Sequence, residues 1–327
     1  MMCNKSQQST LNPQLALLQF RHKLIKALRD FFYERNYLEV ETPNLMTTVA
    51  PDPNIDALKV FIDDRGPFFL HTSPEMGMKK ILLHGHKRIF QICKVYRVEE
   101  QADIHNTEFT MLEWYREGTY LDAMEEVEEL ISCVAGMLTI DNSEVFARPW
   151  KIYELSELFM AMTRINPFGL TRDELFASME SLGFPGIDER DAWNDLFFKL
   201  FIQEVEPKIP QDVPYFIMDW PLSVSTMAKR KDENRVERFE LYIKGLEIAN
   251  GYSELLDVSE QRKRFEQDNL ERKASGKQTF VIDGGFIDAL NGIKGPCTGV
   301  SIGVDRLIMV LLGKERIEDV LINRIRL

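Results

Sequence analysis

The sequence is poor in cysteine and has no apolar run long enough to cross a membrane. The four cysteines are far apart and form no Cys-x-x-Cys pair, namely Cys3, Cys93, Cys133 and Cys297. This spacing argues against a disulfide framework or a zinc site and is typical of reduced thiols. The charge-free apolar stretch 130–140 is well short of the roughly 18–20 apolar residues that a membrane-spanning helix needs. The N-terminus, 1–13, is polar and shows no secretory signal, so we expect a cytoplasmic protein.

Motifs for metals and nucleotides are also scarce. The close histidine pair His84-Gly85-His86 lies at a glycine without an obvious third ligand, and we interpret it as a solvated turn rather than a metal site. Neither Gly-x-x-x-x-Gly-Lys-Ser/Thr nor Gly-x-Gly-x-x-Gly occurs. Neither of the two common nucleotide-binding folds is therefore indicated.

The composition is that of a soluble globular protein with an acidic balance. Hydrophobic residues make up 44% of the 327 residues, and the 21 Phe, 9 Tyr and 4 Trp supply enough apolar surface for a core. The 40 basic and 52 acidic residues give a formal net charge of −12. A protein that coats nucleic acid or binds a membrane surface needs a positive face, so both classes are disfavoured.

The residue pattern predicts strands that follow one another along the chain. Strands are predicted at 38–41, 67–71, 89–98, 109–116, 214–219, 238–244, 246–254 and 299–303, and helices at 15–35, 121–138, 259–274 and 304–312. Leu121 is expected among the inward residues of its helix. Ser73 as N-cap, with Pro74 and Glu75 in the first turn, predicts a further helix that runs to Gly85.

This order favours an α+β fold over a doubly wound parallel sheet, because helices and strands do not alternate regularly. We expect an antiparallel β-sheet flanked by helices in a single domain, 15–327, after a flexible N-terminus, 1–14. A helical insertion is expected at about 150–208, where Thr171 and Glu174 form a capping box.

Carboxylates lie where core strands should be apolar. Period two places Phe109, Met111, Glu113 and Tyr115 on one face of a strand, and further carboxylates lie in 240–254, namely Glu240, Glu247 and Glu254. Each would be an edge carboxylate facing water if it stood alone. Buried together, these groups would cost several kcal/mol unless paired, so they predict a cationic guest, either a metal ion or an ammonium.

Glycines and arginines supply an anion-binding counterpart. In 299–306, glycines let a ligand approach the backbone, and Arg306 lies in the first turn of a helix, where the dipole also favours negative charge. Arg97 and Arg306 are therefore candidates to bind phosphates, although each alone is more typical of a surface arginine.

Taken in order, three features resemble the three signature motifs of class II aminoacyl-tRNA synthetases. They are a helix and strand that end at Pro43, Arg97-x-Glu99 with a loop and second strand, and Gly299-x-x-x-Gly303-x-x-Arg306. Within that class, 72–75, 105–113 and 247–255 resemble the lysyl branch. The resemblance extends from about residue 15 to the end of the sequence.

The pattern begins within the first twenty residues, which leaves no room for the anticodon-binding barrel of lysyl-tRNA synthetases. The sequence therefore resembles the family of free-standing paralogues that activate (R)-β-lysine with ATP and attach it to a lysine of elongation factor P; 235–240 and 264–269 resemble that branch. The resemblance implies a ligase with an aminoacyl-adenylate intermediate, Mg²⁺, elongation factor P rather than tRNA as partner, and a homodimer through the strand near Pro43. No membrane partner is expected.

The resemblance also implies site residues. ATP would be bound by Arg97, Val98, Glu99, His105, Asn106, Phe109, Glu247, Ile248, Gly303 and Arg306. Mg²⁺ would be held by Glu240 and Glu247. The amino acid would be bound by Ser73, Pro74, Glu75, Glu113, Tyr115, Asn250, Glu254 and Ser301. Arg97 and Arg306 would be catalytic, on the α- and γ-phosphates.

Three positions depart from the family pattern. Val98 stands where Asn is usual, Thr107 where Pro is usual, and Ser301 where true synthetases have Gly and the paralogues usually have Ala. Two other functions remain open: a ligase for α-lysine or for another acceptor, and a catalytically inactive amino-acid sensor. The complete set of phosphate- and metal-binding residues argues against the sensor.

Overall fold

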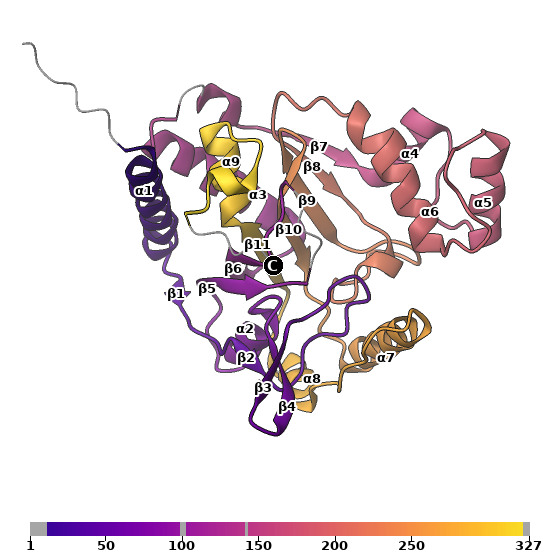
Figure 1. Ribbon diagram of the computed structural model, residues 1–327, viewed down its shortest axis with the longest axis horizontal. Coiled ribbons are helices and arrows are strands. Elements are labelled where there is room, and N and C mark those ends of the chain that lie inside the picture. The colour runs from indigo at the N-terminus through magenta and orange to yellow at the C-terminus, as the bar shows by residue number, and fades with distance from the viewer. Residues whose placement is uncertain (1–11, 99–102, 141–142, 323–327) are drawn as a thin grey trace, which may run out of the picture.

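The computed structural model describes residues 12–98, 103–140 and 143–322, with an eight-stranded sheet at its centre (Figure 1). From edge to edge the strands are β1 (Leu38–Glu39), β5 (Ile89–Tyr96), β6 (Glu108–Glu117), β11 (Cys297–Gly303), β10 (Leu246–Ser253), β9 (Arg238–Ile243), β8 (Tyr215–Met218) and β7 (Lys151–Glu154). The six strands from β5 to β8 are antiparallel, which confirms the α+β prediction.

Both edges of the sheet correct the expectation of a purely antiparallel sheet. β1 pairs parallel with β5, and β7 pairs parallel with β8. Each of these pairs is joined by a long crossover, which parallel strands require. The crossover between β7 and β8 is the helical region expected at about 150–208, which begins with a strand and contains α4 (Leu155–Thr163), α5 (Arg172–Ser181) and α6 (Trp193–Leu200).

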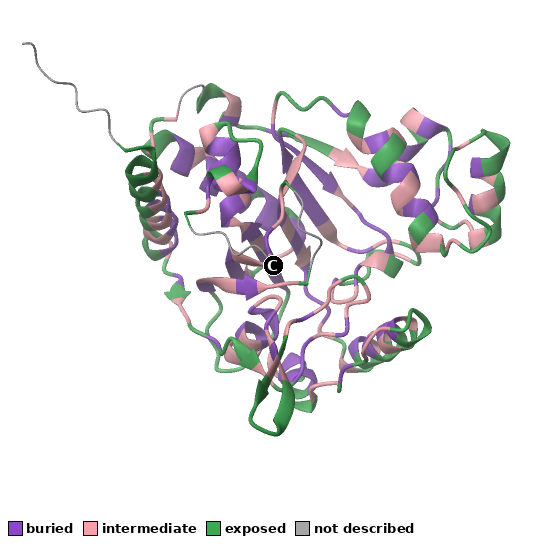
Figure 2. Cartoon of the chain, in the orientation of Figure 1, coloured by how far each residue is buried: buried purple, intermediate pink, exposed green. Residues whose placement is uncertain are grey.

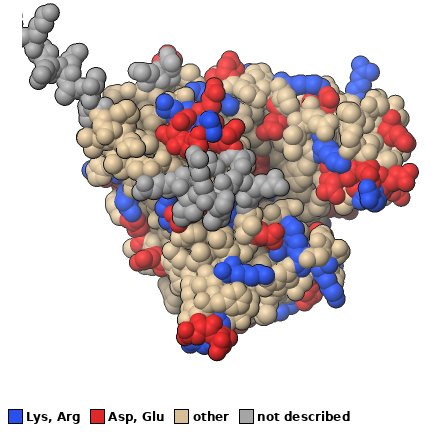
Figure 3. Space-filling view, viewed as in Figure 1, with Lys and Arg blue, Asp and Glu red and all other residues tan. Residues whose placement is uncertain are grey.

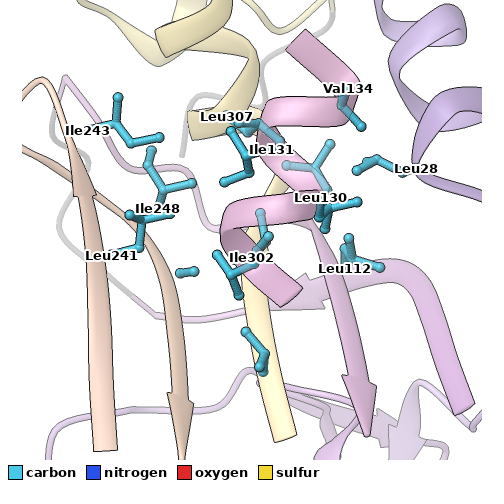
Figure 4. Close-up of a cluster of buried hydrophobic side chains, with 14 of the residues drawn as sticks. Leu28, Leu112, Leu130, Ile131, Val134, Leu241, Ile243, Ile248, Ile302 and Leu307 are labelled. Atoms are coloured by element: carbon cyan, nitrogen blue, oxygen red, sulfur yellow. The ribbon is translucent and has the colours of Figure 1, made fainter. Parts of the chain in front are cut away.

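One face of the sheet forms the main apolar core. It is covered by α1 (Pro13–Glu34), α3 (Tyr120–Met137) and α9 (Val304–Leu312). Figure 4 shows Leu130 and Ile131 of α3 among side chains from the strands, including Leu112, Leu241 and Ile302. Because side chains alternate along a strand, Glu113 and Glu240 point to the opposite face, as do the residues that pair with them on the adjacent strands.

Among the described helices and strands, those that cover the opposite face lie at its two ends. The helices α4 and α6 pack over β8 and β9, where Tyr215, Ile217 and Tyr242 complete a second core. At the other end, α2 (Glu75–Leu82), α7 (Val258–Ala274) and α8 (Gly284–Gly292) pack with a small sheet made of β2 (Leu45–Met46), β4 (Arg65–Leu70) and β3 (Lys59–Ile62). Figure 2 shows the exposed tip of the β3–β4 hairpin below the buried central strands. The middle of this face remains free for a site.

The helix ends follow from local chemistry, with two corrections. Pro74 rather than Ser73 is the N-cap of α2, and the Ser73 hydroxyl accepts the Glu75 backbone N–H at 3.0 Å. Leu121, expected to point inward, is 53% exposed, because it lies on the solvent face of the first turn of α3. The capping box of Thr171 and Glu174 is confirmed. Short helical turns lie at Ser143–Phe146, Phe201–Val205, Glu206–Lys208, Leu222–Val224 and Ile317–Asp319.

Asp305 holds three elements together beside the free face. Its buried carboxylate accepts a hydrogen bond from Arg21 of α1 at 2.5 Å and from the Thr110 backbone N–H of β6 at 2.7 Å. These contacts hold the first turn of α9 against the sheet, so that Arg306, the next residue, is fixed in position. Within the described ranges, no helix combines the length and apolarity needed to cross a membrane.

Candidate functional site

A cavity of about 560 Å³ opens on the free face of the sheet. Its floor is set by strand register, because Ser301 of β11 lies directly opposite Glu113 of β6 on one side and Asn250 of β10 on the other. Asn250 in turn lies opposite Glu240 of β9. With neighbouring strands about 4.8 Å apart, Glu113 and Glu240 are three strands, roughly 14 Å, from each other. The cavity floor thus carries two carboxylates at separate places.

Small residues of β11 make the cavity deep. Gly299, Ser301 and Gly303 alternate on the cavity face, between longer side chains of β6 and β10. A Cβ at Gly299 would collide with Oε1 of Glu254 and with the ring of Tyr115. The absence of a side chain at this position therefore leaves space over Gly299 for the Glu254 carboxylate beside the Tyr115 ring.

At one end of the cavity, three buried carboxylates surround one lysine. Glu75 Oε1 accepts hydrogen bonds from Lys79 Nζ at 2.5 Å and from the Tyr252 hydroxyl at 2.6 Å. Lys79 also forms an ion pair with Glu254, and neither side chain is exposed at all. Glu113 completes the set, which we call the acidic end. Its carboxylates and its lysine sum to a charge of −2 when all are ionised.

Burial is the largest influence on the pKa values of Glu113 and Glu254 at the acidic end. Burial, followed by repulsion from Glu75, raises the pKa of Glu113 to about 7, although hydrogen bonds donated by Ser73 and Tyr115, both at 2.6 Å, act in the opposite direction. Burial also raises the pKa of Glu254 to about 8, against the attraction of Lys79. A cation that enters the cavity would stabilise the ionised form of these carboxyl groups and lower their pKa values, so its binding is favoured.

At the other end of the cavity, two arginines offer binding groups for anions. The Arg97 guanidinium lies 5.3 Å from the centroid of the Phe109 ring, and its Nε donates to the Thr72 carbonyl at 3.2 Å. Arg306 donates to the Glu247 carbonyl at 3.0 Å and contacts His105 Nε2 at 2.6 Å. Both guanidinium groups line the cavity, so a phosphate chain could lie between them.

Two carboxylates near these arginines could bind a divalent cation. Glu240 is buried and accepts from Arg238 at 2.5 Å and from the Tyr242 hydroxyl at 2.7 Å. Burial and the nearby Glu247 raise the pKa of Glu240 to about 7, which an added cation would reverse. Across the described residues, no group of three or more His, Cys, Asp or Glu side chains could hold a metal alone. Two carboxylates fit Mg²⁺, which takes its remaining ligands from phosphates and water.

The structure brings most of the predicted site residues into this cavity. Those that line it are Ser73, Glu75, Arg97, His105, Asn106, Phe109, Glu113, Tyr115, Glu240, Glu247, Ile248, Asn250, Ser301, Gly303 and Arg306. Three predicted residues do not line it: Pro74 caps α2, Val98 is 56% exposed, and the buried Glu254 takes the space that a side chain at position 299 would fill. Glu99 lies outside the described residues.

Sequence reasoning missed Lys79, Tyr252, Arg238 and the loop 48–55, which forms a wall of the cavity. Lys79 had one detectable signal, since Glu75 and Lys79 are four residues apart on a helix and so lie on one face. No local pattern marks the loop, because the long-range contacts of Arg272 hold it. That guanidinium, buried in α7, donates to the carbonyls of Asp52 and Ile55 at 2.6 and 3.1 Å.

Comparison with known proteins matches residues 8–323 to the family of tRNA synthetases class II (D, K and N). The chain is 37% identical over 323 residues to the elongation factor P–(R)-β-lysine ligase of Vibrio atlanticus, covering 95% of this chain and 97% of the relative. It is 39% identical over 308 residues to the ligase of the same name from Mannheimia succiniciproducens, covering 92% of each chain. It is 35% identical over 327 residues to the ligase of the same name from Salmonella arizonae, covering 97% of this chain and 98% of the relative.

The raised pKa of Glu113 predicts a pH-dependent effect of Glu113→Gln on stability. The folded protein keeps the Glu113 proton up to about pH 7, whereas the unfolded chain releases it near pH 4.3. Glu113 therefore lowers the unfolding free energy of wild type as the pH rises through this window, and the variant lacks this contribution. The unfolding free energy of the variant minus that of wild type should rise by roughly 3 kcal/mol between pH 4.5 and 7.

Urea denaturation across this pH range measures the difference directly. Glu34→Gln is the control, because that side chain is 66% exposed. A Glu113→Gln difference that stays constant with pH would show that the carboxyl titrates normally.

Proposed function

Because the chain belongs to the family of class II tRNA synthetases (D, K and N), we propose that it is an ATP-dependent ligase that joins (R)-β-lysine to a lysine side chain of elongation factor P. One observation carries the substrate class: the acidic end buries three carboxyl groups around one lysine, and its charge is −2 when Glu75, Glu113, Glu254 and Lys79 are all ionised. A diamino acid brings two ammonium groups, which neutralise that charge.

The ammonium groups have distinct partners in this proposal. Ser73 and Glu75 bind the amine near the carboxylate, whereas Glu113, Tyr115 and Glu254 bind the distal ammonium. Oε1 of Glu254 is buried and has no hydrogen-bond partner among the described residues, which supports a role as acceptor for an incoming cation.

The substrate carboxylate has a neutral partner. Asn250 lies on the cavity floor between the acidic end and Glu240, and its Oδ1 has no hydrogen-bond partner among the described residues. Its amide NH₂ donates only a long bond of 3.5 Å to Glu240, so it can turn to a carboxylate. This position directs the carboxylate toward the phosphate-binding end.

In the first step, the substrate carboxylate attacks the α-phosphorus of ATP in line, and pyrophosphate leaves. Arg97 binds the α-phosphate and neutralises charge on the transferring adenylyl group, whereas Arg306 binds the γ-phosphate and neutralises charge on the leaving pyrophosphate. Phe109 stacks on adenine beside Asn106. Glu240 and Glu247 hold Mg²⁺, which would neutralise phosphate charge when bound.

In the second step, a lysine ε-amino group of the partner protein attacks the carbonyl carbon of the mixed anhydride. An amide bond forms, and AMP leaves with the electron pair of the broken C–O bond. No dedicated base lies at the reacting carbon among the described residues, and the adenylate phosphate itself accepts the proton.

Protein rather than tRNA is the proposed acceptor. The relatives are named for elongation factor P, and the net charge of −12 gives little attraction for a polyanion. Figure 3 shows acidic and basic side chains interspersed over the visible face. Nucleic-acid binding would favour a continuous basic surface.

We further propose a homodimer that forms through α1 and β1. Four large apolar side chains on these elements are between 43% and 50% exposed, namely Leu15, Leu18, Tyr33 and Leu38. Pro43, four residues after the end of β1, is also exposed. An exposed apolar stripe of this kind is typical of an interface.

Pyrophosphate exchange into ATP tests the function and the acidic end together. Exchange should depend on (R)-β-lysine, and Glu254→Gln should lower kcat/KM for the amino acid by roughly 30-fold or more, because an ammonium loses a buried charged partner. The KM for ATP should change little, since Glu254 lies at the opposite end of the cavity. Exchange without any amino-acid dependence, or transfer to lysine tRNA in place of elongation factor P, would contradict the proposal.

Ser301→Gly should shift the preference toward α-lysine. The Ser301 side chain lines the cavity between Glu113 and Asn250, where it narrows the space at the α-carbon of a bound amino acid. A β-amino acid carries its amine one carbon further from the carboxylate and avoids this contact. We expect the ratio of kcat/KM values, α-lysine over β-lysine, to rise by roughly tenfold or more. An unchanged ratio would assign the selectivity to Ser73 and Glu75.

Leu38→Asp should convert the dimer into monomers in sedimentation equilibrium, because a charge at an apolar interface is costly to bury. We expect the dimer to weaken by roughly tenfold or more. Leu182→Asp, at a leucine 53% exposed in the region of α5, should leave the mass unchanged. Equal masses for the two variants would place the interface elsewhere.

A further inference from the structure

Lys79 is a buried cation for which the proposed reaction has no direct use. Its side chain is 0% exposed, and its ammonium group contacts only Glu75 and Glu254 as ion-pair partners. The rings of Tyr252 and Phe286 lie 5.6 and 5.8 Å from Nζ. Lysine is almost never fully buried unless its charge is paired, because removing the ammonium group from water costs free energy. A buried lysine at this position therefore indicates a specific role.

The place of Lys79 relative to the cavity indicates that role. Glu75 lines the cavity, whereas Lys79 does not, so the lysine meets the carboxylates from the protein side. A substrate ammonium would approach from the cavity side. The two cations therefore do not compete for one position, and the carboxylate of Glu75 can be shared between them.

Without Lys79, the acidic end would hold three buried carboxylates and no cation. Among the described residues, the ionisable groups close to Nζ are acidic or neutral: Glu75 of α2, Glu113 of β6, Tyr252 of β10, Glu254 after β10, and Cys297 of β11. The described ion pairs include no other Lys or Arg partner for Glu75, Glu113 or Glu254. The free energy of three mutually repelling buried charges would drive at least one to bind a proton.

We propose that Lys79 is a positioning residue for the diamino acid, which favours ionisation of Glu254 and holds the carboxylates of Glu75 and Glu254 in place from behind the cavity. The inference rests on the proposed function. It makes the acidic end a site for two ammonium groups, since Lys79 neutralises one of the three carboxylates and leaves two for the substrate. Loss of the Glu254 proton on binding then costs less free energy than it would without Lys79.

Lys79→Met removes the charge and keeps an unbranched apolar side chain. An opposite charge at ion-pair distance shifts a carboxyl by about 1–3 pKa units, so the KM for β-lysine at pH 7 should rise by roughly 10- to 1000-fold. Wild type and variant should both bind β-lysine better as Glu254 ionises, and the loss should narrow mainly above pH 8, where wild-type Glu254 is already ionised. The kcat and the KM for ATP should stay within about threefold of wild type, because the phosphate end is unchanged.

Two matched variants separate charge from packing. Lys79→Arg keeps the charge and should restore a KM profile with the pH dependence of wild type. Lys80→Met makes the same substitution one residue further along α2, where the ammonium pairs with Asp283 and is 36% exposed, and it should leave the profile unchanged. A Lys79→Met profile parallel to that of wild type would overturn the proposal.

A measurement on the empty protein keeps this test apart from the proposed function. In carboxyl ¹³C NMR, the titration midpoint of Glu254, assigned with Glu254→Gln, should rise by about one to three pH units in Lys79→Met. An unchanged midpoint would refute the role of Lys79, whatever the substrate is. Absence of lysine-dependent exchange in wild type would instead refute the proposed function.

A charge-balanced variant covers the case in which Lys79→Met does not fold. Glu75→Gln combined with Lys79→Met removes one charge of each sign and leaves Glu113 and Glu254, so the net charge stays at −2. It should fold, and its Glu254 midpoint should lie nearer to wild type than that of the single variant. Failure of this double variant to fold would show that Lys79 serves packing, and would also overturn the proposal.

Discussion

The pairing of β11 between β6 and β10 is the constraint on which the rest of the site depends. One short strand sets the register on both sides, so that Ser301 faces Glu113 across one boundary and Asn250 across the other. A slip by one residue would turn every side chain to the wrong face, because the period of a strand is two. Gly299, Ser301 and Gly303 would then enter the apolar core, and Val300 and Ile302 would fill the cavity.

The two faces of this sheet have different roles, one in stability and the other in binding. The face under α1, α3 and α9 is almost wholly apolar and supplies most of the free energy that burial contributes to folding. The other face carries carboxylates that are costly to bury without a partner. The helices at either end of that face keep the cavity walls in place, and Arg272 holds the loop that closes one side. Stability and binding thus come from opposite sides of the same strands.

Charge separation along the cavity links structure to chemistry. The acidic end fits ammonium groups, the arginine end fits phosphates, and Asn250 lies between them as a neutral amide. A substrate that carries both kinds of charge can be oriented by this gradient before any bond changes, and orientation of reacting groups is itself a large part of catalysis. The buried Lys79 belongs to the same scheme, since it sets how much negative charge the acidic end presents.

The amino-acid sequence by itself determined most of the helices, the central strands and the residues that share a strand face, because these depend on local periodicity and on caps within a few residues; α8 was not predicted. Even the pair of Glu75 and Lys79 was readable in principle from its spacing of four. Tertiary structure alone decided the rest. The strand at 38–41 could be predicted, but its parallel pairing could not, and β7 was not predicted, because long crossovers place both edge strands. Glu254 meets Lys79 across 175 positions of sequence, and only the packing of α2 against the end of β10 brings the two charges together, since pairing between distant segments leaves no local trace.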